Sequence, residues 1–263
     1  MKSLFGTHRK ILIGVVHLRP LPGSPRWRGD IESLIDFAVN DARAYERGGA
    51  DAIFIENFGD VPFTKGSVAP ETIAALAAAG RAIRQAVKLP IGFNVLRNDA
   101  RAALALCAVC GGAFVRINVL TGAMLTDQGL IEGNAYDILR YRQRICPEAQ
   151  IFADVHVKHA VPLGNSTIED AARDTVERGL ADALIVSGAG TGLAADLADL
   201  ERVRRTAPDT KILLGSGVTL ANVGDFLPVA DGFIVGSSLK LPGKISNPVD
   251  PKRVAALVRA ISR

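Results

Sequence analysis

The chain has 263 residues, of which 48% are hydrophobic, enough for one large buried core. Lys and Arg number 31 against 27 Asp and Glu, for a formal charge of +4, and the basic residues are scattered among acidic ones. This balance does not favour a nucleic-acid partner, and no apolar run reaches the roughly 18 residues that a membrane span needs. The mild positive charge would attract an anionic substrate, although solvated charges on helix surfaces explain it equally well.

The cysteines are odd in number: Cys107, Cys110 and Cys146. The N-terminal residues MKSLFGTHRK contain no apolar region of signal-peptide length, so the sequence predicts a reducing, cytoplasmic location. Cys107 and Cys110 form a CxxC pattern, which also occurs in redox and zinc sites. Because the pattern falls in an apolar stretch that ends at Gly111, packing of two small side chains is the favoured interpretation.

Short β-branched runs alternate with Ala-rich amphipathic runs along the whole chain, a pattern typical of βα units around a parallel sheet. The predicted strands are Ile11–Val16, Ala52–Glu56, Ile91–Asn94, Phe114–Asn118, Ile151–Val157, Ala183–Val186, Lys211–Leu214 and Gly232–Val235. The predicted helices are Ile31–Arg47, Pro70–Ala86, Asn98–Val109, Asn134–Ile145, Thr167–Arg178, Asp196–Thr206, Leu220–Leu227 and Pro251–Ile261. A doubly wound open sheet fits the same alternation, but eight units favour an α/β protein with a single (β/α)8 TIM-barrel domain over residues 1–263.

Polar residues close the first four predicted strands: His17, Glu56, Asn57, Asn94, Arg116 and Asn118. In a barrel, the carboxyl ends of the strands meet on the face that carries the active site. His17 could polarise a carbonyl or hydroxyl group, or it could be an ordinary loop histidine. Glu56 suits a catalytic base, with a structural partner of Arg116 or Lys158 as the alternative. The three asparagines are predicted to contact substrate.

The fifth predicted strand carries Asp154, His156 and Lys158 at alternate positions, so all three are expected to point the same way, toward the barrel mouth. Such a cluster favours acid–base catalysis. The alternative is a structural group of side chains that only form salt bridges with one another. Lys158 could form a Schiff base, but general-acid or electrostatic duty is favoured because neighbouring acids keep a lysine charged. No cofactor is predicted. A divalent metal on His17, Glu56, Asp154 and His156 stays an alternative, since no compact motif fixes these ligands.

The last two predicted strands are followed by Gly215-Ser216-Gly217 and Gly236-Ser237-Ser238. In a barrel these loops are neighbours, and their glycines let backbone amides approach a phosphate closely. The pair therefore predicts a phosphate-binding site, with two tight turns as the alternative. After the sixth strand, the glycine-rich run 187–192, beginning with Ser187 and Gly188, either extends this site to the substrate or is a plain connection.

Long loops follow the first, second and fourth predicted strands, at 18–30, 58–69 and 119–133. Loops of this length on the catalytic face often close over a substrate and exclude water. A surface that docks another protein would look the same in the sequence.

Five segments together resemble one protein family along essentially the whole chain: GVVHLRPLPGSP at 14–25, DAIFIENFGDVPF at 51–63, RINVLTGAMLTDQGLIEG at 116–133, ADVHVKHA at 153–160, and the paired glycine–serine loops. They are similar to the BtpA/SgcQ family. The resemblance implies a TIM barrel, with one branch linked to photosystem I biogenesis and stability and another found among sugar-phosphate genes. It assigns no catalytic residue.

These observations predict an enzyme acting on a phosphorylated small metabolite, a sugar phosphate or a nucleotide-like compound. Asp154, His156 and Lys158 would perform acid–base chemistry, supported by His17, Glu56 and Arg116. Isomerase, epimerase, lyase and glycosyl-hydrolase reactions all fit. The alternative is a non-catalytic photosystem I biogenesis factor, and a metabolite-binding regulator would need a partner domain. Assembly of the chain into a homo-oligomer is left open.

Overall fold

A computed structural model describes residues 4–5, 10–188, 196–241 and 244–262. Within these ranges, eight parallel strands close into a barrel in the order β1-β11-β10-β9-β7-β4-β3-β2. The predicted (β/α)8 barrel is therefore confirmed. Its strands are β1 (Ile11–His17), β2 (Ala52–Glu56), β3 (Ile91–Asn94), β4 (Phe114–Ile117), β7 (Gln150–Val155), β9 (Ala183–Ser187), β10 (Lys211–Gly215) and β11 (Gly232–Val235).

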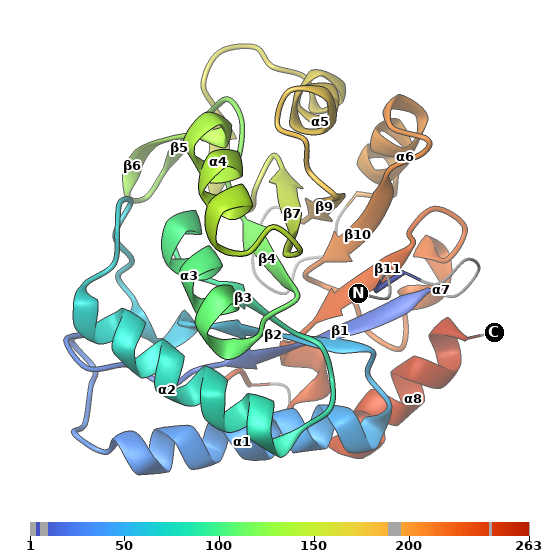
Figure 1. Cartoon of the computed structure of the whole chain (residues 1–263). Helices are drawn as coiled ribbons and strands as arrows, with labels where there is room; N and C mark the ends of the chain where they lie inside the picture. Colours follow the sequence, from blue (N-terminus) through green and yellow to red (C-terminus); the bar gives the residue numbers. More distant parts are fainter. Residues whose placement is uncertain (1–3, 6–9, 189–195, 242–243, 263) are drawn as a thin grey trace.

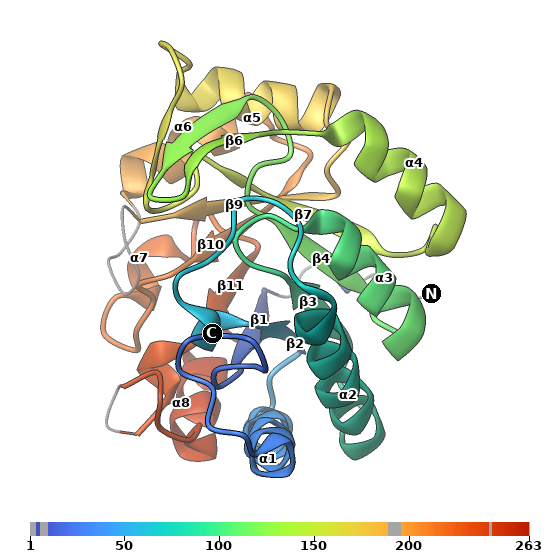
Figure 2. The same cartoon turned by 90° about the vertical axis from the view of Figure 1, so that its left-hand side faces the viewer.

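The helices lie around the outside of the strands (Figures 1 and 2). They are α1 (Ile31–Gly48), α2 (Pro70–Ala86), α3 (Ala100–Cys110), α4 (Ala135–Ile145), α5 (Ile168–Glu177), α6 (Leu197–Thr206), α7 (Val223–Phe226) and α8 (Pro251–Ile261), with short 3-10 turns η1 (Phe58–Asp60) and η2 (Ser237–Leu239). Asp250 caps α8 by accepting a hydrogen bond of 2.8 Å from the Lys252 amide, which satisfies a donor that the first turn leaves unpaired. No helix of the described ranges is long and apolar enough to cross a membrane.

Side chains that point into the barrel change from apolar to polar along three of its strands. A phenylalanine is followed two residues later by a charged residue: Phe54 by Glu56 on β2, Phe114 by Arg116 on β4, and Phe152 by Asp154 on β7. The rings pack inside the barrel, with centroids 4.7 Å apart for Phe54–Phe114 and 5.1 Å apart for Phe114–Phe152. The apolar layer therefore fills the amino-terminal end of the barrel, and the charged layer lies at the carboxyl end.

A second, antiparallel sheet, which we call the flap sheet, lies outside the barrel. Its strands are β5 (Ala123–Thr126), β6 (Gly129–Glu132) and β8 (Ala160–Pro162), in the order β6-β5-β8. The long loop predicted at 119–133 therefore contains two short strands that the prediction missed, because strands of four residues are too short to show a clear alternation. Met124, Ile131 and Val157 form the small core that holds the sheet together.

Among the element boundaries that differ from the prediction, those of β7 and α7 differ most clearly. Strand β7 ends at Val155, not at Val157, because His156 has a φ of 50°, which lies outside the extended region. Helix α7 covers only Val223–Phe226 instead of Leu220–Leu227. Before it, the side chain of Asn222 accepts hydrogen bonds from the amide (2.7 Å) and hydroxyl (3.1 Å) of Thr219, and this turn delays the start of the helix.

Candidate functional site

Two cavities bordered by described residues meet at the carboxyl end of the barrel. The smaller cavity, about 40 Å³, lies between the loops after β10 and β11, and we call it the cup. The larger cavity, about 350 Å³, lies over β2, β3 and β4, and we call it the chamber. Three side chains line both cavities: Glu56, Arg116 and Lys158.

The cup is lined by the residues that the sequence predicts for phosphate, with one exception. They are Ser216, Gly217, Gly236, Ser237 and Ser238, and His17, which was predicted as a catalytic residue, lines the cup beside them. The exception is Gly215, which lies on β10 and does not line the cup. A Cβ at this position would lie 3.0 Å from the Ser187 hydroxyl, so close packing favours glycine here. The two loops are tied together, because the Ser238 hydroxyl donates to the Val218 carbonyl at 2.7 Å.

Arg116, which lines both cavities, forms a buried ion pair with Asp154, which lines neither. The guanidinium donates two hydrogen bonds to the carboxylate, Nε to Oδ2 at 2.8 Å and Nη2 to Oδ1 at 2.7 Å. Asp154 also accepts from the Asn118 amide (3.1 Å) and the Ser187 hydroxyl (3.2 Å). Burial alone would lower the pKa of Arg116, but the Asp154 carboxylate outweighs it and raises that pKa. Asp154 is thus fully occupied in holding Arg116 and is poorly placed to act as a base.

Lys158 reaches the boundary between the two cavities. Its Nζ donates to the Ser216 hydroxyl at 3.3 Å, across the mouth of the cup. Burial, followed by the positive charge of Arg116, lowers the pKa of the Lys158 amine below its ordinary value. An amine whose pKa is lowered gives up its proton more readily, so this position suits general-acid chemistry and charge stabilisation.

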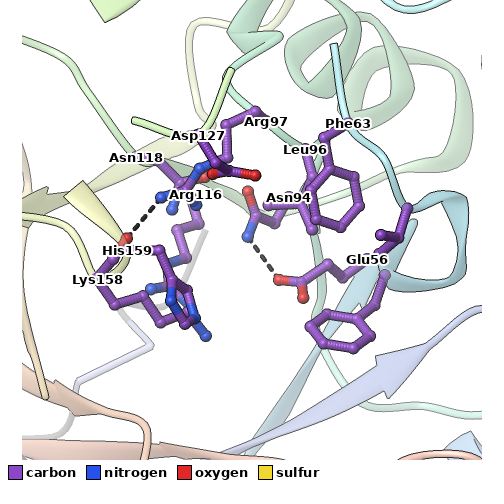
Figure 3. Close-up of a pocket in the computed structure, with 12 residues that line it drawn as sticks. Glu56, Phe63, Asn94, Leu96, Arg97, Arg116, Asn118, Asp127, Lys158 and His159 are labelled. Carbon is purple, nitrogen blue, oxygen red and sulfur yellow. Dashed lines mark hydrogen bonds between the residues drawn. The ribbon is translucent and has the colours of Figure 1, made fainter. Parts of the chain in front are cut away.

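Glu56 and Asn94 end neighbouring strands in register and form the opposite side of the chamber. The Asn94 amide donates to Glu56 Oε2 at 2.6 Å, and both residues are buried. Figure 3 shows Lys158, His159 and Arg116 on one side of the chamber, Glu56 and Phe63 on the other, and Asn94 between them. A proton acceptor and a proton donor therefore face the same cavity from two sides.

His17 borders the cup from the end of β1. Its ring lies edge-on to Phe58, with centroids 5.0 Å apart, and its buried Nδ1 has no hydrogen-bond partner among the described residues. Burial first, and then the charges of Lys240 and Lys158, lower the pKa of His17 well below its ordinary value. A Cβ at position 236 would lie 2.4 Å from His17 Cε1, so Gly236 is required by the ring. His17 is accordingly a neutral hydrogen-bonding group at pH 7.

His156 lines neither the cup nor the chamber, whereas Lys158 lines both, so the prediction that Asp154, His156 and Lys158 all point the same way is wrong for this pair. The strand ends at Val155, and His156 borders a different cavity, together with Asp154, Thr121 and Thr175. The charges nearest to it belong to residues of α5 and α6. Among the described residues, no three His, Cys, Asp or Glu side chains gather closely enough to hold a metal, so the four ligands considered from the sequence do not form one site.

Three of the predicted substrate contacts lie outside the cup and the chamber. Asn57 accepts from the Leu96 amide at 2.7 Å and donates to the Leu96 carbonyl at 3.3 Å, so it ties β2 to the loop after β3. Ser187 contacts Asp154, as described above, and Gly188, which directly follows β9, is buried. The rest of that glycine-rich run, residues 189–192, lies outside the described residues.

Several residues that the sequence did not single out line the chamber. They come from long loops and from the flap sheet: Phe58, Val61, Phe63, Leu96, Arg97, Asp127 and His159. Arg97 is 4% exposed and donates to the Lys158 carbonyl at 2.6 Å, so it holds the segment that carries Lys158. The signal that could have found Arg97 was its position three residues after Asn94, on the same face of the barrel.

Comparison with known proteins confirms the resemblance seen in the sequence. A family model described as BtpA family matches residues 8–263. The photosystem I biogenesis protein BtpA of Synechocystis is 47% identical over 98% of this chain and 90% of its own length. An uncharacterized protein of Pyrococcus furiosus is 49% identical over 95% of this chain and 94% of its own. SgcQ, a protein of the sgc region of Escherichia coli, is 35% identical over 99% and 97%.

Solved structures agree with the fold. A tryptophan synthase structure of Mycobacterium tuberculosis covers 97% of this chain and 93% of its own, with a TM-score of 0.62 and 19% identity. KGPDC of Streptococcus mutans covers 97% and 98%, with a TM-score of 0.61 and 13% identity. Phosphoribosyl anthranilate isomerase of Thermus thermophilus covers 97% and 98%, with a TM-score of 0.58 and 14% identity. At these identities the likeness concerns the barrel alone.

Proposed function

We propose that this chain, which belongs to the BtpA family, is an enzyme acting on a phosphorylated small metabolite, a sugar phosphate or a nucleotide-like compound. The observation that carries the proposal is the meeting of cup and chamber at Glu56, Arg116 and Lys158. A ligand with its phosphate in the cup and its remainder in the chamber would expose the bonds near its phosphate to these three side chains. The phosphoribosyl compound in the name of one barrel of the same fold supports a phosphorylated substrate.

The phosphate group of the proposed substrate would bind in the cup. Most of its lining residues belong to two adjacent strand ends, and Gly217 and Ser216 have φ values of 69° and 77°. Backbone amides in such loops bind phosphate oxygens without a bulky side chain in between. Lys158 adds a positive charge at the mouth of the cup, and the neutral His17 adds a hydrogen-bonding nitrogen.

The proposed chemistry takes place at the junction where the cup and the chamber meet, at Glu56, Arg116 and Lys158. Glu56 would accept a proton, Lys158 would supply one, and Arg116, fixed by Asp154, would stabilise negative charge that develops between them. Isomerisation, epimerisation, elimination and glycoside hydrolysis all need a proton removed at one point and supplied at another. The proposal therefore includes these reaction types and leaves His156 out of the catalytic set.

A second candidate function is a non-catalytic role in photosystem I biogenesis. The observation in its favour is the 47% identity to BtpA of Synechocystis over nearly the whole chain. Such a factor would need the barrel surface but not proton transfer at the junction. If the Lys158→Met variant replaced BtpA in Synechocystis as well as the parent chain does, that result would favour the factor over the enzyme.

The test of the enzyme is a thermal-shift titration with inorganic phosphate, ribose 5-phosphate, glucose 6-phosphate and unphosphorylated ribose. A ligand that binds only the folded state adds about 2.7 kcal/mol at a hundred times its dissociation constant, so a matching phosphate should raise the melting temperature clearly. Ser237→Glu should abolish the rise, because a carboxylate in the cup repels the phosphate. Gln85→Glu adds the same charge on the exposed side of α2 and should leave the rise intact.

The result has a clear meaning in either direction. Stabilisation by a phosphate ester but not by ribose, lost in Ser237→Glu alone, would support the proposed function. No stabilisation by any phosphate, or equal stabilisation in both variants, would contradict it.

A further inference from the structure

The chamber is much larger than the phosphate end of a ligand requires. Its volume of about 350 Å³ compares with about 40 Å³ for the cup. At roughly 30 Å³ per water molecule, the chamber has room for about ten waters, or for a group of similar size on the substrate. The chemistry of the chamber walls therefore indicates what that group is.

One wall of the chamber is apolar and partly aromatic. It consists of Phe58, Val61 and Phe63 from the loop after β2, together with Leu96 from the loop after β3. The rings of Phe58 and Phe63 lie with centroids 6.4 Å apart, and both are only partly buried. Sugar hydroxyls placed against such a wall would lose their hydrogen bonds to water, whereas a flat ring would gain apolar contact.

Another part of the chamber lining offers hydrogen-bond acceptors. Asn94 donates its amide to Glu56, and Asn118 donates its amide to Asp154. Because both partners are carboxylates, each asparagine must turn its NH2 group toward them and its Oδ1 away. Among the described residues, neither Oδ1 has a partner, although Asn94 is 1% and Asn118 is 3% exposed. Buried acceptors without partners are uncommon, and here they belong to two residues that line the chamber.

We propose that the substrate is a phosphorylated sugar that carries a flat aromatic ring. The phosphate binds in the cup, the sugar hydroxyls donate to Glu56 and the neighbouring asparagines, and the ring packs against Phe63 and Phe58. This inference rests on the proposed function, since it assumes that the cup binds the phosphate. It explains why an apolar wall and an acceptor-rich wall share one chamber, which a bare sugar phosphate leaves unexplained.

The test compares ribose 5-phosphate with adenosine and uridine 5′-monophosphates by calorimetric titration. These probes share a phosphorylated pentose, and only the nucleotides add a ring. Stacking of a base on an aromatic side chain should tighten binding of at least one nucleotide at least about tenfold. Phe63→Ala should remove this gain and leave the affinity for ribose 5-phosphate unchanged. Leu220→Ala, which truncates an exposed leucine away from the chamber, is the matched control and should keep the gain.

The outcomes separate the two proposals. If ribose 5-phosphate binds and neither nucleotide binds more tightly, or if the gain survives in Phe63→Ala, the aromatic substrate is overturned and the proposed function stands. If none of the phosphorylated probes binds, the proposed function fails, and the aromatic substrate fails with it. A gain that is lost only in Phe63→Ala supports the inference.

Discussion

The cup and the chamber adjoin at the same end of the barrel, but the chain builds them in different ways. Most of the cup comes from two short segments, 216–218 and 234–238, whose glycines and serines directly follow β10 and β11. The chamber combines strand ends with side chains from long loops and from the flap sheet. A site built from backbone next to regular strands is visible in the sequence, whereas a site built from loop side chains requires the tertiary structure.

The largest expected effect on stability comes from breaking the ion pair between Asp154 and Arg116, the residue that lines both cavities. Asp154→Ala leaves the buried Arg116 without its carboxylate, which should reduce the free energy of unfolding by about 3–5 kcal/mol. Urea denaturation measures the loss. Asp170→Ala removes one partner of an exposed pair with Arg173 and a contact with the α5 cap Thr167, so it should lower the free energy of unfolding by at most about 1 kcal/mol. Equal stability of the Asp154 and Asp170 variants would show that the shared wall does not depend on the pair.

The second largest effect is a pH dependence of the free energy of unfolding that comes from His17 in the cup. His17 has a lowered pKa in the folded state, so below about pH 6.5 the unfolded chain binds a proton that the folded chain does not. The free energy of unfolding should therefore fall by about 1.4 kcal/mol per pH unit from this residue, until the folded pKa is reached. Denaturation of the parent chain and of His17→Gln between pH 7 and pH 5 measures the difference. Parallel pH profiles would contradict the neutral, buried His17.

The smallest effect concerns backbone strain in the cup. Ser216 has a φ of 77°, a conformation that costs a residue with a side chain roughly 1–2 kcal/mol. Ser216→Gly should raise the free energy of unfolding by about 1 kcal/mol, because glycine adopts this φ freely. It should also weaken phosphate binding, since the hydroxyl that accepts from Lys158 is lost. Ser67→Gly, at an exposed position without positive φ, should bring no gain, and a gain there as large as at Ser216 would remove the strain as the cause.

The barrel and most of the residues that line the cup could be predicted from the sequence, for a physical reason. The apolar strands alternate with helices at a regular spacing, and β2, β3 and β11 begin and end where the periodicity predicts. The predicted strand at β7 was too long, because the residues DVHVK at 154–158 do not indicate that His156 has a positive φ. His156 therefore lines neither the cup nor the chamber, whereas Asp154 binds Arg116 and Lys158 lines the same two cavities as Arg116.

The chamber shows what the sequence could not provide. Glu56, Asn94 and Asn118 were found because they close strands, but Phe63 and Asp127 belong to long loops whose paths depend on tertiary contacts. Asn57 also closes a strand, yet it is used to bind the backbone of Leu96 instead of facing the cavity. Adjacent polar residues at a strand end can thus have opposite roles, and only the folded geometry separates them.

The most direct test of the central claim is a crystal structure of the protein with adenosine 5′-monophosphate. We expect the phosphate within hydrogen-bonding distance of the backbone amides of Gly217 and Ser237, and the ring against Phe63. A phosphate bound to Arg97 with the cup empty would contradict this account. So would a ligand in the separate cavity lined by Arg19, Arg26 and Trp27.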